Sequence, residues 1–221
     1  MPTKGELVEG SEEAIFRALA LRNLEVPVGD FITNALNTEV PDTARELLLS
    51  NVQDEIKHDI ALGNIAVAHG TDAKAEQEAQ SLQKAWVEHH DHTILKAMVA
   101  ERSLFFVLLP FFRANGDAGM RSASADISID ERGHVACNSL VCRELGLKPS
   151  KSLDALRKAT ISWVMAPLKA GNPNKYLDKD FWLKSSDRLM YEGKAPELSF
   201  TQSSRMLAFF EHSNVNLPQY A

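Results

Sequence analysis

The sequence predicts an all-α fold: a four-helix bundle with extra helices and an irregular C-terminal segment. Apolar residues recur at helical spacing through most of the chain, and no stretch alternates apolar and polar residues as a strand would. Glutamate and histidine three residues apart lie on one face of a helix. Two such Glu-x-x-His pairs occur, and each follows a further glutamate by the same interval: Glu25 precedes Glu55 and His58, and Glu101 precedes Glu131 and His134.

Composition places the chain among ordinary globular proteins. Of its 221 residues, 44% are apolar and 24% are charged, which is enough for a large core. We expect a bundle domain over residues 1–170 and, over 171–221, an extension that packs on the bundle or forms a tail. The net charge of −6 argues against nucleic acid or an anionic membrane as a partner.

Cys137 and Cys142 point in different directions on one predicted helix, which predicts reduced thiols. The sequence has no signal peptide and no membrane-spanning run, so we expect a cytoplasmic protein.

The first half of the chain predicts three helical stretches. A helix over about 10–25 meets Pro27 and Gly29, which should kink it, and residues 30–37 extend it. Pro41 and Asp42 open a long helix that runs to His69 and ends at Gly70. A polar helix over about 72–88 follows, as a surface helix or a crossover.

The second half begins with a helix over about 92–113, in which Pro110 predicts a local break near the glutamates. A turn at 115–117 leads to a helix that ends before Gly146, and residues 152–168 form another amphipathic helix. From Gly171 onward turn residues multiply.

The paired glutamates lie on apolar stripes and should therefore point inward. Glu101, for example, has Ala97, Met98, Leu104 and Phe105 as its helical neighbours. Each ionised carboxylate in a core costs several kcal/mol, so four would unfold a domain of ordinary stability. Two divalent metal ions balance four carboxylates when both histidines are neutral. The expected ligands are therefore Glu25, Glu55, His58, Glu101, Glu131 and His134.

The first ligand has alternatives, because Glu12 and Glu13 also fall on the first helix. Position favours Glu25, since an antiparallel partner of the long helix must offer its ligand near residue 24. Among the remaining polar residues, Asp130 precedes a ligand and can orient His58 or His134. Asp59 either assists a ligand or is exposed. The stretch Glu88, His89, His90, Asp91 and His92 is either a second metal site or, as we expect, a set of solvated loop residues.

The segment Glu101 to His134, with Phe105, Phe106 and the run Asp130-Glu131-Arg-Gly-His134, resembles the small, radical-generating subunit of class I ribonucleotide reductase. The resemblance extends over about residues 12–146 in pattern. It implies a ferritin-like dimetal-carboxylate protein with two iron or manganese ions, or one of each, and dioxygen as a co-substrate. It also implies a homodimer and a ribonucleotide reductase large subunit as a possible partner.

Three departures from that family are visible. Leu62 replaces the radical-bearing tyrosine, and the expected pocket of Leu62, Phe105, Leu109 and Ile127 is apolar, so no tyrosyl radical forms there. The interval from Glu55 to Glu101 is shorter than in the family. The C-terminal residues 216–221 include Tyr220 but lack the acidic character of the family's docking tail.

The leading hypothesis is therefore an oxygen-activating dimetal oxidoreductase that keeps its oxidising equivalent on the metals. It acts either on a partner, through aromatic residues such as Tyr191, Tyr220 and the tryptophans, or on a small organic molecule near Leu62. A stand-alone ferritin-like monooxygenase or oxidase is the second reading. Metal storage or a structural bundle is the third. Carboxylate and imidazole ligands do not choose between iron and manganese.

Overall fold

The computed structural model describes residues 5–37 and 40–199, and its regular structure is helical throughout these ranges. The only non-helical pairing within them is an isolated parallel bridge between Lys169 and Asp178. The predicted all-α fold is confirmed at this level. No helix in the described part of the chain is both long enough and apolar enough to cross a membrane.

The first column of the bundle is interrupted earlier than the sequence predicted. It consists of α1 (Glu12–Ala20), the 3₁₀ turn η1 (Leu21–Leu24) and α2 (Glu25–Leu36). The expected kink at Pro27 and Gly29 was wrong, because Pro27 lies in the first turn of α2, where a missing N–H costs nothing. The break instead makes Glu25 the first residue of a new helix.

The next two helices follow the prediction closely. The long helix α3 (Asp42–His69) ends where Gly70 adopts φ 88°, a conformation that favours glycine. The polar helix α4 (Ala73–Glu88) is capped by Asp72, whose side chain accepts a hydrogen bond from the backbone N–H of Ala75.

The third column contains a π-helical turn, and the fourth is a single helix. The third column runs through α5 (Thr93–Ala100), the π turn η2 (Glu101–Phe105) and α6 (Phe106–Asn115). The break expected at Pro110 was misplaced, because α6 runs through the proline and the irregular turn lies earlier, at Glu101–Phe105. The fourth column, α7 (Ala118–Glu144), starts at the cap Asp117 and is followed by Gly146 with φ 66°.

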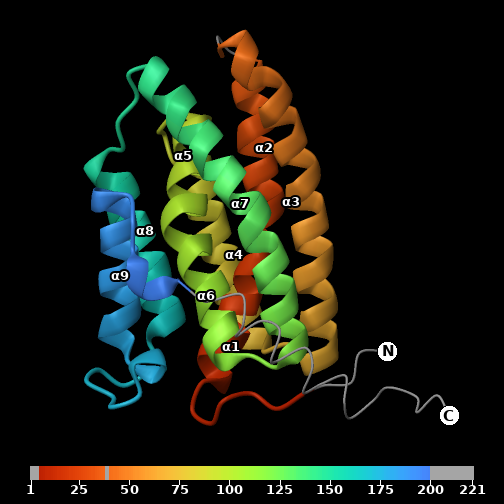
Figure 1. Ribbon diagram of the computed structural model, residues 1–221, viewed down its shortest axis with the longest axis vertical. Helices are drawn as coiled ribbons and strands as arrows, with labels where there is room; N and C mark the ends of the chain where they lie inside the picture. The colour runs from red at the N-terminus through yellow and green to blue at the C-terminus, as the bar shows by residue number, and fades with distance from the viewer. Residues whose placement is uncertain (1–4, 38–39, 200–221) are drawn as a thin grey trace, which may run out of the picture.

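These four columns form a closed ring. Helix α3 packs between α2 and α7, α5 contacts both α2 and α7, and α6 lies along α7. Figure 1 shows the four columns side by side, with α3 at the right-hand edge. Most of the apolar core lies between them, and it includes Ile15, Leu48, Leu104 and Val141.

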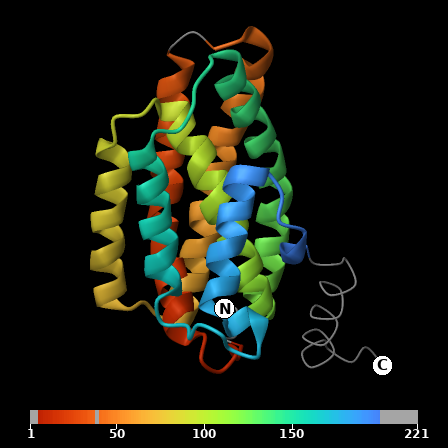
Figure 2. The same cartoon turned by 90° about the vertical axis from the view of Figure 1, so that its left-hand side faces the viewer.

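A second layer covers one side of this ring. It contains α4, α8 (Lys151–Met165) and α9 (Lys179–Glu192), which pack against α1, η2 and α6. Figure 2 views this layer from the front, with α4, α8 and α9 side by side. The expected irregular region after Gly171 thus contains a full helix, together with the short turns η3 (Lys175–Leu177) and η4 (Pro196–Leu198). Tyr220 and the tail 216–221 lie outside the described residues.

Candidate metal centre

All six predicted ligands are buried and meet inside the ring of columns. Glu25, Glu55, Glu101 and Glu131 are 0% exposed, and His58 and His134 are at most 2% exposed. One comes from α2, two from α3, one from η2 and two from α7. Glu12 and Glu13, the alternatives for the first ligand, are exposed on α1. The structure therefore favours Glu25.

The six side chains form two groups that share Glu55. Ligand atoms of one group lie within 4.8 Å of one another, and this group contains Glu25, Glu55, His58 and Glu131. The second group contains Glu55, Glu101 and His134 under the same limit. A pair of overlapping groups with a shared carboxylate is the arrangement that a carboxylate-bridged pair of metal ions requires.

Each histidine contacts the glutamate of the opposite helix more closely than its own. Nδ1 of His58 lies 3.3 Å from Oε1 of Glu131 but 3.9 Å from Oε2 of Glu55. Nδ1 of His134 lies 2.9 Å from Oε1 of Glu55 but 3.7 Å from Oε2 of Glu131. The two rings are 5.7 Å apart between centroids. The two Glu-x-x-His pairs thus form one crossed cluster and not two separate sites.

The outer nitrogens of the two histidines also face opposite helices. Nε2 of His58 lies 3.3 Å from Oδ2 of Asp130, and Nε2 of His134 lies 3.5 Å from Oδ2 of Asp54. Asp130 was expected from the sequence, and Asp54 was not. The signal was present, because an aspartate precedes the glutamate in both motifs (Asp54-Glu55 and Asp130-Glu131). A carboxylate on the outer nitrogen leaves Nδ1 of each ring directed at the cluster.

The carboxylates of the cluster are poorly compensated by the protein. No hydrogen-bond donor with suitable geometry reaches either oxygen of Glu25, Glu55 and Glu131, or one oxygen of Glu101. Nδ1 of each histidine also has no hydrogen-bond partner. Burial raises the pKa of Glu25 well above its usual value, and the nearby Glu55 raises it further. Burial, Glu131 and Glu55 do the same to the pKa of Glu101. Buried polar groups normally have partners, so this set is incomplete on its own.

The histidines respond to the same surplus of negative charge. Burial alone would lower the pKa of His134, but Glu55 and Glu131 raise it to about 9. Burial likewise opposes protonation of His58, yet Glu131, Glu55 and Asp130 raise its pKa. The cluster therefore attracts positive charge. In the protein without metal ions, only protons supply that charge.

Local structure explains how two of the glutamates are placed. Glu25 begins α2 directly after the 3₁₀ turn η1, and its backbone N–H donates to the carbonyl of Arg22. An added Cβ at Gly29 would meet Cβ of Glu55 at 3.5 Å, so α2 and α3 lie close together at this level. Glu101 begins the π turn, and its Oε2 accepts a hydrogen bond of 2.5 Å from the buried amide of Asn138.

The outer layer fixes the π turn. The hydroxyl of Ser186 on α9 donates to the carbonyl of Ser103 at 2.7 Å, and Nε of Arg102 donates to the carbonyl of Leu189 at 2.9 Å. The fully buried Arg157 on α8 donates in turn to Ser186 at 2.7 Å. The region after residue 170 therefore supports the segment that carries Glu101.

The residues present fit a pair of divalent transition-metal ions. Four carboxylates and two imidazoles supply oxygen and nitrogen donors, which suit iron and manganese as well as zinc. The donor atoms are buried, most of them lack another partner, and together they carry excess negative charge. Two positive charges on each ion would offset the four carboxylates and satisfy the orphaned oxygens.

The predicted apolar residues surround the same core. Leu62, Phe105, Leu109 and Ile127 are each at most 5% exposed and belong to one hydrophobic cluster. Leu62 holds the position that the resemblance gave to a radical-bearing tyrosine. A substrate pocket at these side chains stays a prediction.

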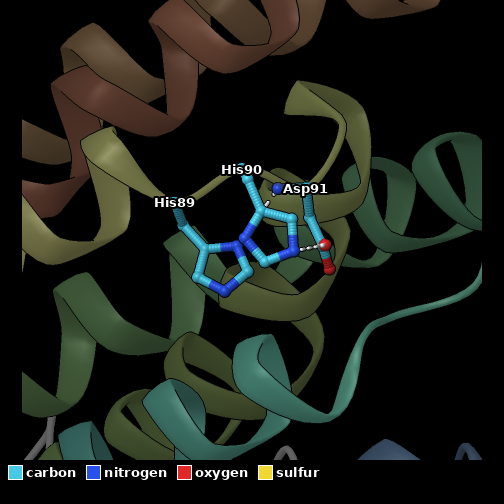
Figure 3. Close-up of side chains that lie close together, drawn as sticks. All are labelled: His89, His90 and Asp91. Atoms are coloured by element: carbon cyan, nitrogen blue, oxygen red, sulfur yellow. Dashed lines mark hydrogen bonds and ion pairs between the residues drawn. The ribbon is translucent and has the colours of Figure 1, made fainter.

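The second histidine-rich stretch does not resemble the buried centre. His89, His90 and Asp91 form a group at the junction between α4 and α5, and Figure 3 shows the two rings stacked beside each other, with His90 directed at Asp91. The ring nitrogens of His89 are already used, because Nδ1 accepts the N–H of Asp91 and Nε2 lies 3.2 Å from the hydroxyl of Ser152. His92 caps α5. These contacts favour a loop-stabilising role.

Asp59, which the sequence left open, is half-buried and makes no hydrogen bond or ion pair with another described residue. It therefore takes no part in orienting a ligand.

Comparisons with known proteins found no match for this chain. No protein-family model, curated protein or solved structure matches the sequence or the fold.

Proposed function

We propose that this protein is a dimetal-carboxylate oxidoreductase that activates dioxygen within a ferritin-like four-helix bundle. It would act as a shortened, tyrosine-less relative of the ribonucleotide reductase small subunit. The observation that carries the proposal is the crossed cluster of four buried glutamates and two histidines, whose inward-facing atoms lack partners. A purely structural core would not retain so many uncompensated carboxylates, because each costs several kcal/mol.

The two groups of donor atoms support the following ligand roles. Glu25, Glu55 and His58 would hold one ion, and Glu101, Glu131 and His134 the other. Glu55 and Glu131 would bridge the two. Glu55 belongs to both groups of donors, and Glu131 lies within 3.7 Å of the inner nitrogen of each histidine, which supports the bridging roles.

When bound, a pair of iron or manganese ions supplies the redox capacity to reduce dioxygen. The chain's own residues prepare the setting for this chemistry. Asp54 and Asp130 hold the outer ring nitrogens, so that the inner nitrogens of both histidines stay directed at the ions. Leu62, Phe105 and Ile127 are buried apolar side chains of the same core and would keep water from the site.

The leucine at position 62 affects which molecule the centre would oxidise. With no tyrosine at this position, oxidation would be passed either to a partner protein or to a small organic molecule. The ribonucleotide reductase reading requires aromatic residues between the centre and the surface, and Tyr191 is 60% exposed on α9. The second candidate, a stand-alone monooxygenase or oxidase, is favoured by the apolar setting of Leu62 and Phe105.

The first experiment measures metal binding and oxygen chemistry together. The metal-free protein is incubated with Fe²⁺, Mn²⁺ or both, exposed to air and desalted, and its metal content, EPR spectrum and oxygen consumption are then recorded. We expect about two ions per chain. Glu55→Ala and Glu131→Ala should each lose most of this metal, whereas Glu13→Ala, at an exposed glutamate, should not. A wild-type protein that retains neither iron nor manganese would refute the proposal.

A second experiment separates the possible functions. Binding to a ribonucleotide reductase large subunit, followed by assay of nucleotide reduction, supports the reductase reading, and failure of both leaves the oxygenase reading. Metal storage, the third class, requires uptake of many ions per chain, which the same metal analysis detects. The cytoplasm is the proposed compartment, because both Cys137 and Cys142 are free and buried.

A further inference from the structure

A surface groove runs along α7, on the side of this helix that borders η2 and α6. It consists of three hollows of about 350, 370 and 310 Å³. Neighbouring hollows share lining residues, since Phe106 and Arg132 belong to the first and second, and Arg102 and Ser139 to the second and third. The three hollows therefore form one continuous surface, which we call the α7 groove.

The two ends of the α7 groove are basic, although the whole chain carries a net charge of −6. Arg132 and Lys194 line the first hollow, and Arg143 and Lys148 line the third. These four side chains make no hydrogen bond or ion pair with another described residue. None of the described residues that line the three hollows is an aspartate or a glutamate. The two ends are about 16 Å apart, because Arg132 and Arg143 are separated by 11 residues of one helix.

Apolar side chains line the middle of the groove, and they include Phe106, Val135 and Leu189. Arg102 also lies there, but its Nε already donates to the carbonyl of Leu189 at 2.9 Å. The groove therefore has a basic end, an apolar middle and a second basic end. A hollow lined by one sign of charge concentrates counter-ions of the opposite sign, so the ends favour anionic groups.

We propose that the α7 groove binds an elongated organic dianion, with an acidic group at each end and an apolar body between them. The arginines and lysines at the ends bind carboxylate or phosphate groups through charge-assisted hydrogen bonds. The apolar middle removes the body of the ligand from water. Arg102 and Arg132 directly follow Glu101 and Glu131, so the groove lies beside the segments that carry two of the buried glutamates. Binding requires no metal ion, and the proposal is therefore independent of the dimetal chemistry.

Calorimetric titration of the metal-free full chain at low ionic strength tests the class of ligand. The probe is dodecanedioate, whose extended chain is about as long as the distance between the basic ends. Dodecanoate has one acidic group, and adipate has two but is too short to reach both ends. We expect dodecanedioate to bind about tenfold or more tightly than either, because only it uses both ends. A bisphosphonate of the same length shows which acidic group the ends prefer.

Charge reversal at one end tests the position of the ligand. Arg143→Glu/Lys148→Glu should lower the affinity for dodecanedioate about tenfold, to that of dodecanoate, and Arg132→Glu/Lys194→Glu should do the same. The matched control is Lys74→Glu/Lys84→Glu, which changes the net charge equally at side chains of α4 that are 78% and 72% exposed. The control should keep nearly the full affinity. Circular dichroism verifies that each variant is folded.

Two results would overturn the proposal. The first is a wild-type protein that binds dodecanedioate no more tightly than dodecanoate and adipate, or that loses no affinity when either end is reversed. The second is a peptide with acidic ends and an apolar centre that binds more tightly than every small dianion, which would assign the groove to a partner protein.

Discussion

Replacement of Glu25 by glutamine should change the stability of the metal-free and metal-bound proteins in opposite directions. Glu25 is fully buried beside Glu55, and neither of its oxygens has a hydrogen-bond donor. Glutamine keeps the shape of the side chain and removes its capacity for negative charge. Because the wild-type carboxyl avoids most of the ionic cost by taking up a proton, we expect the metal-free variant to gain about 1–2 kcal/mol.

The metal-bound protein should lose more than this. An ion present at a hundred times its Kd stabilises the fold by about 2.7 kcal/mol, and the loss of a ligand removes much of that contribution. For a chain of this size 1 kcal/mol corresponds to about 2–4 °C in Tm. The variant should therefore melt about 2–8 °C higher than the wild type without metal, and its Mn²⁺-induced rise in Tm should be smaller by about 5–10 °C.

Differential scanning calorimetry with a chelator, and then with Mn²⁺, measures both effects. Glu13→Gln is the control, because Glu13 is 67% exposed and pairs only with Arg17; it should leave both values nearly unchanged. A Glu25→Gln variant that melts lower without metal and keeps the full metal-induced rise would show that Glu25 is an ordinary buried residue and not a ligand.

Three further predictions concern the surroundings of the centre. Asp54→Asn and Asp130→Asn should each weaken Mn²⁺ binding by about tenfold, measured by calorimetric titration, and unchanged affinity in both would contradict an orienting role. Arg157→Met should lower the free energy of unfolding in urea by about 1–3 kcal/mol, because the buried Ser186 hydroxyl and Asp187 lose their partner, whereas Asp154 keeps Lys158 and Tyr191. Burial alone would raise the pKa of Asp117, but backbone N–H groups and His69 lower it. The ionised Asp117 therefore stabilises the fold at pH values above the usual carboxyl range. This contribution is lost as pH falls through the lowered pKa. The stability difference between wild type and Asp117→Asn should therefore shrink as pH falls below the usual carboxyl range, and a constant difference would contradict this.

The helix ends and the members of the buried glutamate–histidine cluster were largely predictable from local sequence. Gly70 and Gly146 adopt positive φ just beyond α3 and α7, as their positions after amphipathic stretches indicated. The spacing of Glu55 and His58 fixes them to one face of a helix wherever that helix packs. These features depend on interactions within a few residues, so the sequence expresses them directly.

Two errors have a common physical origin. The break in the first column falls at residues 21–24 and not at Pro27, and the irregular turn of the third column begins at Glu101 and not at Pro110. In both places the distortion lies at a glutamate of the buried cluster. The prolines were read as local breakers, but contacts with neighbouring helices decide where a helix is distorted, and the bond from Ser186 on α9 to Ser103 is one of these.

The sequence by itself determined that the chain is helical, that four glutamates and two histidines lie on inward faces, and that no tyrosine follows His58. Only the tertiary structure decided that the two motifs cross, so that His58 faces Glu131 and His134 faces Glu55. It also brought Asp54 and Asp130 to the outer nitrogens. The reason is that helical periodicity gives the direction of a side chain on its own helix, whereas its neighbours depend on how helices distant in sequence pack together.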